Sequence, residues 1–166
     1  MTANCGMCGP FLMCGGGGQP NICGALTGAG QTGTVSSSNP GVAPEDMTKA
    51  FDSSSATKWF AGNGVKTGWI AYQFAAAASH IVTSYALTSA NDVPTRNPSA
   101  WQLQGSNDGQ TWTTLDTRTG QTFAAAFATN PYTAANNTAY PRYRLNITAN
   151  NGGPDLQLAE LQLFGQ

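Results

Sequence analysis

The 166-residue chain has a formal net charge of −1, and only 9% of its residues are charged. Nucleic-acid binding needs clustered lysine and arginine side chains that neutralise phosphates, so this composition argues against it. No apolar run approaches the roughly 20 residues of a membrane span, which argues against membrane insertion. The surface must be built from Asn, Gln, Ser, Thr and Gly, and such a surface suits an extracellular or cell-surface protein.

The chain divides into a Cys/Gly-rich N-terminal arm, residues 1–30, and a domain at residues 31–166. All the cysteines lie in the arm with the spacing C-x2-C-x5-C-x8-C, and the arm has too few large apolar residues to form a core of its own. Disulfides, a zinc site and covalent links between copies of the chain are three interpretations that stay open. The residues concerned are Cys5, Cys8, Cys14 and Cys23.

Short alternating runs separated by turns follow the arm, which predicts an all-β sandwich. In the run GWIAYQF, for example, Ile70, Tyr72 and Phe74 point to one face and the intervening side chains to the other. The alanine run at residues 75–79 is too short for a stable helix, so we expect a connection there. The predicted strands are residues 32–38, 68–74, 80–90, 100–106, a return strand beginning at Trp112, 121–127, 142–149 and 156–164.

Asp108-Gly109 predicts the hairpin that joins the fourth and fifth of these strands. We expect Trp69, Trp101 and Trp112 to belong to the core.

The segments AFDSSSATKW, GWIAYQF, SANDVPTRNPSAWQLQGSNDGQTW, YRLNITANNG and LQLAELQLF together resemble a discoidin domain, also called a coagulation factor 5/8 type C domain. Bacterial members of that family are similar to carbohydrate-binding module family 32. The resemblance covers residues 36–164 in the family's order and spacing. It implies an eight-stranded jelly-roll sandwich of the galactose-binding type, with the arm outside it.

The resemblance also implies a structural calcium site in the loop that follows Ala50. Calcium prefers six to eight hard oxygen ligands, and Glu160 supports the site because it is a lone acid in an apolar strand. In the alternative, Asp52 caps its own turn, and Glu160 pairs with Lys49 or Lys58. The family's Asp-Gly-Asn loop is Asp52-Ser53-Ser54 here. The implied ligands are Lys49, Asp52, Ser54, Thr57, Ala159 and Glu160.

Sugar binding in family 32 uses loops at the same end of the sandwich. There an aromatic face packs on the C–H face of a pyranose, and polar groups bind its hydroxyls. Two alternatives accompany this prediction: Trp59 belongs to the core, and Asp92 pairs with Arg96 to brace their loop. The implied ligand-binding residues are Trp59, Phe60, Asn91, Asp92, Arg96, Asn150 and Asn151.

Two function classes follow from these residues. The first is a non-catalytic extracellular module that binds a glycan or polysaccharide and holds a structural calcium. The second is a structural subunit of an extracellular filament or surface assembly that self-associates through residues 1–30. Catalysis is not expected, because the sequence holds no nucleophile motif, no zinc-protease motif and no pair of carboxylates suited to glycoside hydrolysis.

Overall fold

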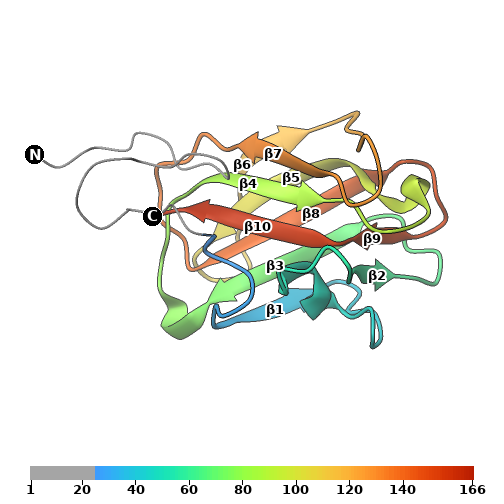
Figure 1. Cartoon of the computed structure of the whole chain (residues 1–166). Helices are drawn as coiled ribbons and strands as arrows, with labels where there is room; N and C mark the ends of the chain where they lie inside the picture. Colours follow the sequence, from blue (N-terminus) through green and yellow to red (C-terminus); the bar gives the residue numbers. More distant parts are fainter. Residues whose placement is uncertain (1–24) are drawn as a thin grey trace, which may run out of the picture.

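The computed structural model describes residues 25–166. The expectations for Cys5, Cys8, Cys14 and Cys23 therefore lie outside the described residues, as does most of the arm. Residues 25–166 form an antiparallel β-sandwich, which confirms the predicted fold class (Figure 1). No helix in this part of the chain is long and apolar enough to cross a membrane.

A five-stranded sheet in the order β1-β3-β8-β5-β6 packs against a three-stranded sheet in the order β10-β4-β7. The short pair β2-β9 extends one end of the sandwich. The strands are β1 (Gly33–Ser37), β2 (Trp59–Ala61), β3 (Gly68–Phe74), β4 (Val82–Thr88), β5 (Pro98–Ser106), β6 (Thr113–Arg118), β7 (Thr129–Thr133), β8 (Arg142–Asn150), β9 (Leu156–Leu158) and β10 (Glu160–Gly165). Three short 3-10 turns are η1 (Met47–Phe51), η2 (Ala75–Ala77) and η3 (Pro94–Arg96).

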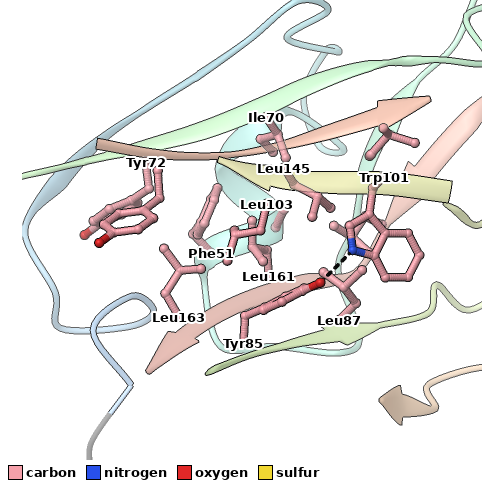
Figure 2. Close-up of a cluster of buried hydrophobic side chains, with 14 of the residues drawn as sticks. Phe51, Ile70, Tyr72, Tyr85, Leu87, Trp101, Leu103, Leu145, Leu161 and Leu163 are labelled. Atoms are coloured by element: carbon pink, nitrogen blue, oxygen red, sulfur yellow. Dashed lines mark hydrogen bonds between the residues drawn. The ribbon is translucent and has the colours of Figure 1, made fainter. Parts of the chain in front are cut away.

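The core lies between the two sheets, where alternate residues of facing strands meet (Figure 2). Trp101 of β5 and Tyr85 of β4 are fully buried, and the Trp101 Nε1–H donates to the Tyr85 hydroxyl at 2.9 Å. That hydroxyl in turn donates to Asp116 Oδ2 at 2.6 Å. Because a buried polar group without a partner is costly, this chain of bonds allows the large rings to pack in an otherwise apolar centre.

Residues before the predicted domain boundary already belong to the sandwich. The Leu26 amide donates to the Leu163 carbonyl at 2.7 Å, and Thr27 exchanges hydrogen bonds with Leu161 and Leu163 of β10. Residues 25–30 therefore pack on the sandwich although they precede the predicted boundary, and Ala25 forms a bridge with Phe164.

Two predicted strands are wrong in detail. Residues 121–127 form a connection, because their alanines offer little surface to bury and Phe127 adopts a left-handed backbone with φ of 61°. The neighbouring strand β7 begins later and contains Pro131, which is tolerated because β7 is an edge strand. Residues 156–164 break at Ala159 into β9 and β10. β2 (Trp59–Ala61) was not predicted at all, so the described residues hold ten strands where eight were predicted.

The prediction that three tryptophans belong to the core is only partly correct. Trp101 is a core residue, as expected. Trp69 and Trp112 are half-buried on the opposite, outer face of the five-stranded sheet, so the prediction that they belong to the core is wrong. Trp69 alternates with the inward-facing Ile70 along β3, which places it on the outer face.

Candidate binding site at the loop end

Antiparallel pairing brings several connections to one end of the sandwich, the end that carries β2 and β9 in Figure 1. We call residues 38–46, 89–97, 119–128 and 151–155 the loop end. The C-terminus lies at the opposite end of the sandwich.

Exposed apolar side chains lie on three of the loop-end segments. Val42, Val93 and Phe127 are 80%, 39% and 49% exposed, and they are the large hydrophobic residues that residues 25–166 leave exposed. Val93 and Phe127 also adopt positive φ angles of 31° and 61°, where side chains other than glycine are strained. Exposed residues in strained loop conformations are typical of functional sites. Sequence reasoning missed Phe127 because the run QTFAAAF was assigned to a strand.

Lys58 is the centre of a charged cluster at the same end of the sandwich. Its side chain is buried, and its Nζ lies 2.6 Å from Asp92 Oδ1 and 3.5 Å from Glu45 Oε1. Partial burial acts to raise the pKa of Asp92, but the Lys58 ammonium outweighs it and lowers the pKa overall. The Gln157 amide donates to the Asp92 carbonyl at 2.6 Å, so the backbone of this loop is fixed as well. Both carboxylates remain more than two-fifths exposed and can accept bonds from a ligand.

Arg96 does not pair with Asp92, so that expectation is wrong. The Arg96 NH2 group lies 3.3 Å from Asp155 Oδ2, and its guanidinium carbon lies 4.9 Å from the centre of the half-buried Phe60 ring. Its buried Nε has no hydrogen-bond partner among the described residues. Asp92 and Arg96 therefore brace the same rim through different partners, and Arg96 already covers Phe60.

The three asparagines predicted to bind a ligand divide into two kinds. Asn91 is exposed, and its side chain makes no hydrogen bond to the described residues. The Asn150 amide donates to the carbonyls of Gly153 and Asp155 at 3.0 and 2.6 Å. The Asn151 amide donates to the Asn97 carbonyl at 3.1 Å. Asn91 is thus available to a ligand, whereas the amides of Asn150 and Asn151 hold loops in place.

Trp59 is fully buried, and its Nε1–H donates to the Asn39 carbonyl at 2.8 Å. It has no exposed ring to offer a sugar, so its assignment to the ligand site is wrong and the alternative, a core tryptophan, is what the structure has. Its burial follows from pairing with Leu158 of β9, in the short sheet that covers this end of the core.

Four of the implied calcium ligands meet where the start of β10 approaches the loop after η1. Asp52 accepts bonds from the Ser54 amide at 3.0 Å and from the Thr57 hydroxyl at 2.8 Å. Glu160 Oε1 accepts from the same Ser54 amide at 3.0 Å. The other two, Lys49 and Ala159, precede these acids in the chain, in η1 and immediately before β10.

Glu160 has an unsatisfied oxygen. The residue is 4% exposed, and its buried Oε2 has no hydrogen-bond partner among the described residues. Burial and the neighbouring Asp52 raise the pKa of Glu160 to about 8. Neither lysine of the alternative reaches it, because Lys49 pairs with Asp52 at 3.4 Å and Lys58 pairs elsewhere. Asp52 does cap its turn, as the alternative proposed.

The donor set is consistent with a hard cation. Two carboxylates, the Thr57 hydroxyl and nearby carbonyls offer only oxygen, the donor that calcium prefers. Within residues 25–166, no three acidic, His or Cys side chains gather, so a cation here would depend on carbonyl oxygens. Ser53 adopts the left-handed conformation that the family's glycine would take, with φ of 62°. Its hydroxyl accepts a 2.8 Å bond from the Ala29 amide, which offsets the strain.

The sequence profile of the F5/8 type C domain matches residues 32–161. The chain belongs to this family. A curated relative, the peptide-N(4)-(N-acetyl-beta-glucosaminyl)asparagine amidase of Arabidopsis thaliana, is 36% identical over 138 residues. The match covers 80% of this chain but 19% of that protein, so the chain spans about a fifth of the relative's length.

Solved structures of sugar-binding modules share the fold. Chitosan-binding module 1 from a Paenibacillus sp. IK-5 chitosanase/glucanase is 25% identical, with a TM-score of 0.69 over 86% of this chain and 99% of that chain. A family 32 carbohydrate-binding module from Clostridium perfringens, in complex with galactose, has a TM-score of 0.65 at 14% identity. It aligns with 80% of this chain and 93% of its own. These modules align with the β-sandwich, the part of the chain that the family profile matches.

Proposed function

We propose that the chain is a non-catalytic glycan-binding module of an extracellular or cell-surface protein, and that it binds its glycan at the loop end. The observation that carries this proposal is that the exposed apolar side chains, Phe127 above all, lie on loops at this end, which also carries charged groups held in place by mutual pairing. An aromatic ring can pack on the C–H face of a sugar, while oriented polar groups bind its hydroxyls.

The comparisons support this class of ligand. The names of the similar modules refer to chitosan and galactose, and both are neutral or basic sugars rich in hydroxyl groups. The amidase activity named for the Arabidopsis relative forms no part of the proposal, because four-fifths of that protein has no counterpart in this chain.

A structural calcium belongs to the same proposal. Asp52, Ser54, Thr57 and Glu160 would hold the ion, with the carbonyls of Lys49 and Ala159 completing the shell. The buried, unpartnered Glu160 Oε2 is the observation that supports it, because a cation would satisfy that oxygen and neutralise its charge. The ion would fix the loop after η1 to β10 and would take no part in chemistry.

A glycan array probed with the purified protein in calcium buffer tests the binding proposal. We expect a neutral or amino-sugar glycan to bind. We also expect Phe127→Ala and Asn91→Ala each to weaken binding by about tenfold or more without lowering Tm, because both side chains are exposed. Asn137→Ala is the matched control, an exposed asparagine in the connection at the opposite end of the sandwich.

Two results would overturn the proposal. One is an array on which no neutral or amino-sugar glycan binds in the presence of calcium. The other is glycan binding that survives both loop-end substitutions unchanged.

A further inference from the structure

The outer face of the five-stranded sheet carries polar side chains in cross-strand rows. The pairing of β3, β8 and β5 places Ala71, Arg144 and Gln104 in one row. Gln73 and Arg142 lie side by side in the next row. Because side chains two residues apart share a face of a strand, both arginines point outward from the sheet, away from the core.

An open hollow of about 160 Å³ lies on this face between two indoles, Trp69 and Trp112. Trp112 comes from the turn between β5 and β6, and its Nε1–H donates to the Gly109 carbonyl at 3.2 Å. The hollow is smaller than the roughly 300 Å³ of pockets that enclose drug-sized ligands, so it suits one unit of a chain that continues over the open face.

The two arginines are oriented but have no carboxylate partner. Arg144 Nε donates to Gln104 at 2.7 Å, and Arg142 donates to Gln73 and to the Asn107 carbonyl at 3.0 and 2.6 Å. No acidic side chain among the described residues lies within ion-pair distance of either guanidinium, whereas Arg96 and Arg118 each have one.

Both terminal nitrogens of Arg144 and one of Arg142 make no hydrogen bond to the described residues. The Arg144 guanidinium also lies 4.2 Å from the centre of the Trp112 ring, which holds it in place.

We propose that this face is a second glycan-binding site, specific for an acidic glycan whose carboxylate the Arg142 and Arg144 guanidiniums bind between the two indoles. A planar carboxylate matches the paired N–H groups of a guanidinium. The Gln73 amide offers a bond to a sugar hydroxyl, whereas the Gln104 amide already donates to Gln102 and Thr114. The indoles offer apolar surface to the sugar ring. The site stands apart from the loop end: Arg144 and Asn150 lie six residues apart on β8, roughly 20 Å at about 3.3 Å per residue.

Charge favours an acidic glycan over two other possible occupants of this face, the N-terminal segment of the chain and a nucleic acid. The N-terminal residues 1–24 contain no Asp or Glu, so that segment has no side chain to neutralise the arginines. A nucleic acid gains affinity by displacing counterions along many phosphates, and two arginines on a chain of net charge −1 provide few such contacts.

Titration calorimetry with a short galacturonate oligomer, and with its methyl-esterified neutral counterpart, tests the proposal. We expect the acidic oligomer to bind, the neutral one to bind at least about tenfold more weakly, and added salt to weaken the acidic one. Arg144→Gln and Trp112→Ala should each reduce affinity by about tenfold or more. Arg144→Lys should recover only part of it, because the ammonium lacks the planar fork.

Controls separate this site from the loop end. Lys66→Gln removes an exposed positive charge elsewhere and should leave galacturonate binding intact, as should Phe127→Ala. Equal binding of the neutral oligomer, equal binding of an oligonucleotide of the same charge, or binding that survives Arg144→Gln and Trp112→Ala would overturn the proposal. Galacturonate binding lost in Phe127→Ala would also overturn it, since the ligand would then occupy the loop end.

Discussion

At the scale of single residues, Glu160 predicts an unusual dependence of stability on pH. In protein freed of cations, burial and Asp52 raise its pKa from 4.5 to about 8. Between these values the folded protein keeps a proton that the unfolded chain has released, so the free energy of unfolding falls as pH rises. We expect Tm in chelator to be lower at about pH 9 than at about pH 5, by on the order of 5 °C or more.

Calcium should remove this fall, because an ion bound to Glu160 keeps the carboxylate charged in the folded state. Glu160→Gln is the control, since a glutamine does not titrate and the variant should lose the difference between chelator and calcium. Thermal unfolding followed by circular dichroism at the two pH values measures both effects. A wild-type Tm in chelator that does not change between them would contradict the raised pKa.

The positions of individual side chains were harder to predict than the loops that carry them. A sequence pattern places an aromatic residue near a loop but does not show which way the ring points. Trp59 and Phe60 are neighbours, yet pairing with β9 buries the first and leaves the second half-buried under Arg96. Lys58 was not predicted to organise the rim, because both of its acidic partners are far from it in sequence.

At the scale of elements, a small residue in β5 allows a neighbouring segment to approach closely. A Cβ atom added to Gly105 would overlap the ring of Tyr140, which backbone bonds to His80 hold in place. Gly105→Ala should therefore lower the free energy of unfolding by roughly 1–3 kcal/mol, as overpacked cores do. A double-mutant cycle with Tyr140→Leu, followed by chemical denaturation, tests whether the ring is the cause. The loss of unfolding free energy caused by Gly105→Ala should be smaller when Tyr140→Leu has removed the ring. If Gly105→Ala lowered the free energy of unfolding equally with and without Tyr140→Leu, the cause would be the backbone at residue 105 and not the Tyr140 ring.

Strand boundaries show which patterns are reliable. Residues 68–74 alternate without interruption, and the structure has a strand with those same bounds. Residues 156–164 were predicted as one strand, although Leu158 and Leu161 are three residues apart. A regular strand cannot point both side chains to one face, yet both belong to the same core cluster, so the chain breaks between them. That odd spacing was visible in the sequence and predicts the break at Ala159.

At the scale of the whole molecule, the Ser54–Glu160 contact joins segments that are 106 residues apart. A cation there would resist every opening motion that separates the loop after η1 from β10, because such motions must release the ion. It would have no effect on openings at the far end that leave the site intact. Global unfolding also releases the ion, so the slowest amides of the central strand β8 should gain protection as well.

Hydrogen exchange with and without calcium measures this pattern. We expect calcium to slow exchange at residues 53–58, at the first residues of β10 and at the slowest amides of β8. Exchange in the Asp108–Gly109 turn should not change, because that turn lies at the opposite end and opens locally. Glu160→Gln should abolish every difference. A calcium effect as large in the turn as in residues 53–58 would show that the ion acts elsewhere, and the proposed cation site would be wrong.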